Sequence, residues 1–116
     1  MQDLNEIRIT GTLFNEPTLQ STSKGGKVSR FSVGVRRKDP SKVYDFMNVV
    51  AWDDAAAFVK DNFHEQERIS IKGSMHAEKY VSHDGTEKKT YRIYAEDIMD
   101  PEDSTTYYIQ YSSKES

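Results

Sequence analysis

Alternation of apolar and polar positions dominates this chain and predicts β-strands along most of it. The alternation is clearest between Val43 and Trp52. Successive side chains of a strand face opposite sides, so Met47, Val49 and Ala51 share one face, an ordinary core face. The opposite face carries aromatic rings among other residues: Tyr44, Phe46, Asn48, Val50 and Trp52. Such a strand is either covered on both sides, or covered on one side and used for binding on the other.

The same alternation predicts four further strands, separated by turn signals. These strands are expected at residues 6–14, 28–36, 68–81 and 88–98. Gly11 lies where a barrel strand would bend. Phe31, Val33 and Val35 form the core face of the second strand. The last two strands are joined through Asp84-Gly85, a dipeptide typical of hairpin turns.

After Trp52 the period changes to that of a short helix, expected over residues 55–63 with Asp53 or Asp54 as its N-cap. Three strands, one helix and two strands is the element order of the OB-fold, a five-stranded Greek-key barrel that often binds oligonucleotides. The sequence therefore predicts an all-β OB-fold with one short helix between strands three and four. A different small barrel is the alternative that the periodicity leaves open.

The length of 116 residues predicts one domain, and the composition narrows its setting. Residues 1–99 are expected to form the OB-fold domain, and residues 100–116 a C-terminal extension that is either an extra strand or a mobile tail. There is no cysteine, which excludes a disulfide framework and a thiolate zinc site. No apolar run has membrane-spanning length and no signal peptide is recognisable, so we expect a cytoplasmic, nucleoid-associated protein without a membrane partner.

The net charge of −3 argues against binding nucleic acid by charge alone. The segment 100–116 carries all of that net charge, so residues 1–99 sum to zero. A neutral body that binds nucleic acid must rely on stacking between side chains and bases. Unpaired bases need flat rings of the kind that Phe46 and Trp52 offer on the non-core face. The alternative is that these rings are core or oligomer-interface residues.

Several segments, in this order and spacing, resemble the bacterial single-stranded DNA-binding protein family over residues 5–99. They are Asn5–Gly11, Glu16–Leu19, Val28–Val35, Asp45–Trp52, Ile69–Gly73, the Asp84-Gly85 turn with Tyr91, and Ala95–Ile98. The resemblance implies stacking residues on the strand before the helix and on the long hairpin. The expected stacking residues are Phe46, Trp52, Tyr80 and Tyr44. Cations on outer strand faces and in the basic loop are the expected phosphate contacts: Arg30, Arg36, Arg37, Lys38, Lys72 and Lys79.

The function that follows is sequence-tolerant binding and protection of single-stranded DNA in replication, recombination and repair. The alternatives are an OB-fold protein-interaction or replication accessory module, and an RNA-binding OB domain. An enzyme is not expected, because no carboxylate cluster and no histidine spacing suggests a catalytic or metal site, and no cofactor is implied. Glu78 and Glu87 weaken the positive field of the expected hairpin.

The resemblance also implies a homo-oligomer, with a homotetramer favoured over a dimer and the first strand at a dimer interface. Family members commonly end in an acidic and apolar tip that recruits partners. The residues Tyr111–Ser116 do not match such a tip, so recruitment of partners by that route is not expected.

Overall fold

A computed structural model of the chain describes residues 2–110. Its elements are β1 (Ile7–Leu13), β2 (Gln20–Ser21), β3 (Lys27–Arg36), β4 (Tyr44–Trp52), α1 (Asp53–Asn62), β5 (Arg68–Val81), β6 (Glu87–Asp100) and β7 (Asp103–Tyr108). The five expected strands correspond to β1, β3, β4, β5 and β6, and the expected helix to α1. Within the described residues, no helix is long and apolar enough to cross a membrane.

Five strands form a closed ring of hydrogen-bonded neighbours. β1 pairs with β5, β5 with β6, β6 with β4 and β4 with β3, and β3 closes the ring by pairing with β1. The β4–β6 pairing is parallel, through Val49 opposite Ile93 and Val50 opposite Tyr94, and the other pairings are antiparallel. A five-stranded closed barrel with its helix between the third and fourth ring strands is the predicted OB-fold, which is thereby confirmed.

Two glycines allow backbones to approach closely enough for the barrel to close. Just after Gly11, β1 begins to pair with β3 while it is still paired with β5, and a Cβ at Gly11 would lie 2.3 Å from the Gly34 carbonyl oxygen. At Gly73, beside a bulge in the β5–β6 pairing, a Cβ would lie 2.0 Å from the Tyr94 carbonyl oxygen. Neither space admits a side chain, so both bends depend on glycine.

The core has the parity that the alternation predicts. Val49 and Ala51 are buried and Met47 packs against the core, while the neighbouring Phe31 and Val33 of β3 are buried with them. The helix α1 contributes Ala55, Ala56 and Val59 to the same core.

The start of α1 differs from the expectation. Trp52 is the N-cap residue, the helix begins at Asp53, and no side chain caps it, so the expected aspartate cap is wrong. The Asp53 carboxylate instead accepts a hydrogen bond of 3.0 Å from the backbone N–H of Lys27 at the start of β3. A contact with a residue 26 positions earlier has displaced the local capping interaction.

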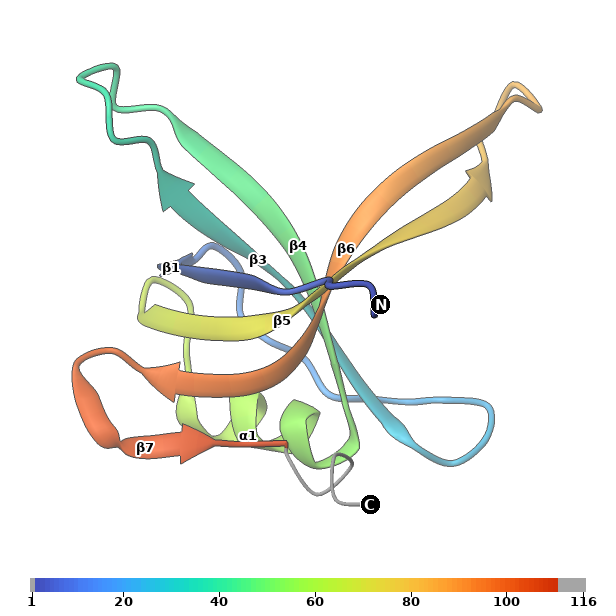
Figure 1. Cartoon of the computed structure of the whole chain (residues 1–116). Helices are drawn as coiled ribbons and strands as arrows, with labels where there is room; N and C mark the ends of the chain where they lie inside the picture. Colours follow the sequence, from blue (N-terminus) through green and yellow to red (C-terminus); the bar gives the residue numbers. More distant parts are fainter. Residues whose placement is uncertain (1, 111–116) are drawn as a thin grey trace.

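Two hairpins extend beyond the barrel and diverge from each other (Figure 1). We call residues 34–46 the β3–β4 arm and residues 74–94 the β5–β6 arm. The β5–β6 arm ends in the expected turn, where Gly85 has a positive φ of 84° and donates a hydrogen bond to the Ser82 carbonyl. Each arm is therefore a two-stranded ribbon with one face continuous with the outer wall of the barrel.

The segment after residue 99 adds a strand to this same chain as far as Tyr108. β6 runs to Asp100, and β7 returns antiparallel to it with Tyr108 opposite Ile98. The Tyr108 ring packs 5.9 Å from the Phe58 ring of α1. The part of the expected C-terminal extension at residue 111 and beyond lies outside the described residues.

Candidate nucleic-acid interface

One outer surface runs from β4 onto the β5–β6 arm. The parallel register places Val50 beside Tyr94, and the rings of Trp52 and Tyr94 meet edge to face with centroids 4.7 Å apart. We call this surface the aromatic face. It comprises the outward side chains of β3 and β4 with those of the arm residues that share the parity of Tyr94: Ser74, His76, Glu78, Tyr80, Lys88, Thr90 and Arg92.

All four of the expected stacking residues lie on the aromatic face. Tyr44, Phe46 and Trp52 are outward on β4, and Tyr80 lies near the end of the β5–β6 arm. Phe46 is 58% exposed and Trp52 39% exposed, so neither ring belongs to the core of this chain. The rings are thus available to a partner molecule, as the alternation along β4 predicts.

A first ring cluster contains a residue that the sequence analysis missed. Phe14, just beyond β1, lies with its ring centroid 4.8 Å from that of Phe46 and 5.5 Å from that of Tyr44. Alternation indicates that Phe14 points outward, because Leu13 before it points into the core. Nothing in the local sequence indicates that it meets β4.

A second ring cluster surrounds Trp52. Tyr94 contacts Trp52 edge to face, and His76 stacks on Tyr94 with centroids 3.8 Å apart and planes 12° from parallel. A 2.8 Å hydrogen bond between the Ser74 hydroxyl and Nε2 of His76 fixes the imidazole. His76 shares the parity of Tyr80 on β5, and Tyr94 on β6 lies opposite Ser74, so both side chains are on the face that carries Tyr80. Alternation along each strand was the signal from which their outward direction could have been predicted.

The expected cations divide between different surfaces. Arg30 and Arg36 lie on the aromatic face, opposite Val50 and Tyr44, and both are exposed. Arg37 forms a bidentate ion pair with Asp45 at 3.0–3.2 Å within the β3–β4 arm. That pairing raises the pKa of Arg37 and lowers the pKa of Asp45, since each charge stabilises the other.

Lys38 and Lys79 lie near the ends of the arms. Lys38 is exposed in the connection that ends the β3–β4 arm. Lys79 lies opposite Lys89 on the β5–β6 arm, so it points to the other face from its neighbour Tyr80. The exposed ring of Tyr91 lies on that other face too, opposite Ala77.

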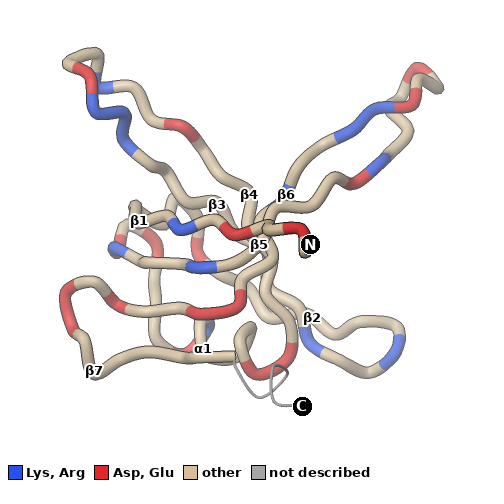
Figure 2. The backbone as a smooth tube through the Cα atoms, viewed as in Figure 1, with Lys and Arg blue, Asp and Glu red and all other residues tan. Residues whose placement is uncertain are grey.

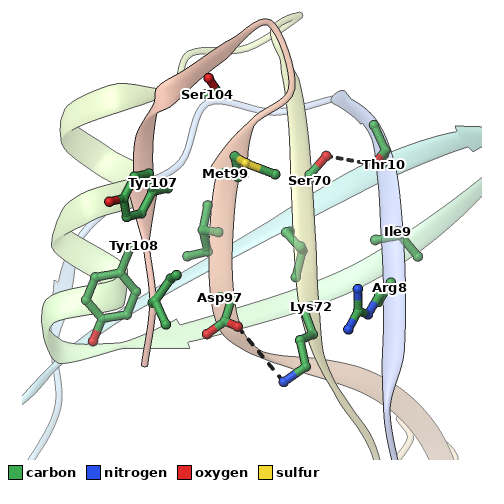
Figure 3. Close-up of a pocket in the computed structure, with 13 residues that line it drawn as sticks. Arg8, Ile9, Thr10, Ser70, Lys72, Asp97, Met99, Ser104, Tyr107 and Tyr108 are labelled. Carbon is green, nitrogen blue, oxygen red and sulfur yellow. Dashed lines mark hydrogen bonds and ion pairs between the residues drawn. The ribbon is translucent and has the colours of Figure 1, made fainter. Parts of the chain in front are cut away.

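Lys72 lies on a different wall of the barrel (Figure 3). Its ammonium group is 3.7 Å from Glu96 and 3.9 Å from Asp97, and its side chain is only a quarter exposed. It lines a pocket of about 580 Å³ between β1, β5, β6 and β7. The structure therefore separates Lys72 from the rings with which the sequence analysis grouped it.

A carboxylate lies within the aromatic face. Glu78 accepts a 2.8 Å hydrogen bond from Nε of Arg92 and a 3.1 Å hydrogen bond from the Tyr94 hydroxyl. The Arg92 hydrogen bond is the main reason that the pKa of Glu78 is lowered, and the nearby charge of Arg30 adds to it. Burial, followed by the hydrogen bond to Glu78, raises the pKa of Tyr94.

The charges are unevenly distributed along the molecule (Figure 2). Basic segments occur along both arms with acidic segments among them, whereas the segments around β7 and the start of α1 are mainly acidic. A pocket of about 460 Å³ beside Trp52 is bordered by Asp53, Asp54 and Glu96, so it is unsuited to a phosphate. Within residues 2–110, no three histidine or acidic side chains are placed to hold a metal ion.

A closed OB barrel with exposed rings and arginines on one continuous face defines a class, that of OB-fold domains with a surface suited to unpaired nucleic acid. Residues 4–100 match the model of the Single-strand binding protein family, and the chain belongs to this family, as its resemblance predicts. The proteins of this family bind DNA and are not enzymes.

Three curated relatives are named as single-stranded DNA-binding proteins. The Fusobacterium nucleatum protein is 29% identical over 101 residues, which are 82% of this chain and 65% of the relative. The Treponema pallidum protein is 25% identical over 65% of this chain and 46% of its own length. Single-stranded DNA-binding protein 3 of Clostridium acetobutylicum is 25% identical over 83% and 69%. The matched part thus spans about half to two thirds of the length of these relatives.

Proposed function

We propose that this protein binds and protects single-stranded DNA without sequence preference, in the cytoplasmic processes of replication, recombination and repair. The observation that carries the proposal is the continuous aromatic face. The exposed rings of Phe46 and Trp52 on this face are suited to stacking with unpaired bases. Membership of the Single-strand binding protein family supports it.

Stacking supplies most of the affinity in this proposal. Each base that stacks on an aromatic ring contributes about 1–3 kcal/mol, and every base has a face that a ring can contact, so no sequence is read. Arg30 and Arg36 lie on the same face and contact phosphates. Each neutralised phosphate contributes roughly −0.7 to the slope of log affinity against log salt. Two such contacts predict a slope of only about −1.4.

Titration of the protein with oligo-dT tests the proposal, because the chain has a single tryptophan, Trp52. Stacking of a base on the indole should quench its fluorescence strongly, and the quenching should persist at moderate salt. Duplex DNA of matched length is the control and should quench weakly. The absence of any change up to tens of micromolar oligo-dT would contradict the proposal.

The protein-interaction alternative has one specific observation in its favour. Glu78 lies within the aromatic face and its charge opposes that of a phosphate. An accessory module would leave the fluorescence of Trp52 unchanged by either oligo-dT or oligo-U. An RNA-binding domain would instead bind oligo-U more tightly than oligo-dT in a direct competition.

Arg36 and Lys72 should behave differently in DNA binding. Arg36→Ala removes an exposed cation from the aromatic face, so it should weaken oligo-dT binding severalfold and make the salt slope shallower by about 0.7. Lys72→Ala should change affinity by no more than about twofold, because that ammonium group is already paired with Glu96 and Asp97. Fluorescence anisotropy at several salt concentrations measures both. An effect of Lys72→Ala as large as that of Arg36→Ala would place the strand on the other wall.

We further propose that the protein is a homo-oligomer, with a homotetramer favoured over a dimer. Exposed apolar side chains, including Met99, Tyr107 and Ile109, border the pocket that contains Lys72, and such surfaces favour association. Light scattering during size-exclusion chromatography measures the mass directly. A mass near 13.4 kDa at all concentrations would contradict this proposal.

A further inference from the structure

Phe14 is held rigidly on the backbone of β3. Its N–H donates a 3.0 Å hydrogen bond to the Ser32 carbonyl, and the side chain of the next residue, Asn15, accepts a 2.8 Å hydrogen bond from the Ser32 N–H. The ring lies directly over Gly34, where an added Cβ would be only 2.6 Å from a ring carbon. The end of β1 is therefore fastened across β3, and Gly34 provides the space for the ring.

From this position Phe14 completes a group of three rings. Its plane is 82° from that of Phe46 and 58° from that of Tyr44, whereas Tyr44 and Phe46 are only 27° from parallel, with centroids 6.5 Å apart. The contact with Phe46 is edge to face and the contact with Tyr44 is tilted, and both lie at centroid distances that are favourable for ring pairs. Phe14 itself remains 36% exposed, so it is open to a ligand as well as packed.

We propose that Phe14, Tyr44 and Phe46 form a subsite for one nucleobase, in which Phe14 contacts the base and fixes the orientation of Phe46. Arg36 lies opposite Tyr44 on the same face and contacts the adjacent phosphate. This inference rests on the proposed single-stranded DNA binding and adds a residue from outside β4 and the long hairpin. The subsite differs from the surroundings of Trp52, where the acidic residues Asp53 and Asp54 border the indole.

The test compares Phe14→Leu with two further variants. Leucine keeps the apolar packing over Gly34 but lacks a ring face, so affinity for oligo-dT should fall about fivefold to tenfold. Phe14→Tyr keeps the ring and should bind within about twofold of the unmodified protein. Tyr91→Leu removes an exposed ring from the other face of the β5–β6 arm, outside the aromatic face, and should leave affinity unchanged.

An abasic oligomer of the same length distinguishes base contact from a general loss of structure. It offers phosphates without bases, so Phe14→Leu should bind it as the unmodified protein does at low salt. An equal loss on the abasic oligomer, or no loss on oligo-dT, would overturn the inference. If the unmodified protein binds no oligo-dT at all, the proposed function fails and the subsite with it. Should Phe14→Leu not fold, Phe14→Met provides the same comparison with a more adaptable side chain.

Discussion

Replacing Phe46 and Trp52 together by alanine is expected to weaken oligo-dT binding by about a hundredfold or more. Each ring contributes about 1–3 kcal/mol through base stacking. The two positions are six residues apart on one strand, roughly 20 Å, and their rings belong to separate clusters. Effects at distant sites without shared partners add, so the double variant should lose nearly the product of the two single losses.

Anisotropy of a labelled oligo-dT measures this loss without the tryptophan signal. Tyr91→Ala is the matched control, because its ring is as exposed as that of Phe46 but lies on the other face of the β5–β6 arm. Its affinity should stay within about twofold of the unmodified protein. Thermal unfolding should show that the double variant still folds, since neither ring is buried. Binding within fivefold of the unmodified protein would show that the strand does not use this face.

The alternation of apolar and polar residues predicts much of the fold, because every strand of a small barrel has one inward and one outward face. The parity of Met47, Val49 and Ala51 is enough to assign the core face of β4, and it also directs Phe46 and Trp52 outward. Local sequence is weaker where a distant contact prevails. Asp53 bonds to the backbone of Lys27 rather than capping its own helix, and no local pattern contains that information.

Predicting the candidate site from sequence works better for its rings than for its charges. Parity fixes which way a ring points, but a long charged side chain takes its role from what lies beside it. Lys72 is outward as expected, yet its neighbours Glu96 and Asp97 come from β6, beside an irregular pairing at Gly73. Phe14 is missed for a similar reason, since its place depends on the space that Gly34 leaves on β3.

Glu78→Gln is expected to tighten oligo-dT binding about tenfold at low salt. The Glu78 carboxylate occupies Arg92 and lies within the field of Arg30, so a phosphate that approaches either cation competes with it and is repelled. Glutamine keeps an oxygen that can accept the hydrogen bond from the Tyr94 hydroxyl but carries no charge. Release of one or two cations should also steepen the salt slope by roughly 0.7 for each phosphate gained.

The pH dependence of DNA binding should differ between the unmodified protein and the Glu78→Gln variant. The pKa of Glu78 is lowered, chiefly by the Arg92 hydrogen bond, so this carboxylate stays charged through the ordinary range of a glutamate and contributes no change in affinity there. Its contribution should appear as a rise in affinity when the pH falls through the lowered pKa. The same ion pair stabilises the fold above the pKa of Glu78 in the unfolded chain, and this stability is lost as the pH falls through the folded-state pKa. The glutamine variant should show neither change from this group.

Glu87→Gln provides the control for net charge. Glu87 lies opposite Val81 on the same arm, on the face away from Tyr80, so its removal changes the total charge equally without releasing Arg92. If the two variants tighten binding equally, the effect comes from the overall field of the arm. If Glu78→Gln weakens binding, the carboxylate serves instead to hold Arg92 in a productive position. A gain confined to Glu78→Gln, with a steeper salt slope, is the result expected of a carboxylate that competes directly with the DNA backbone.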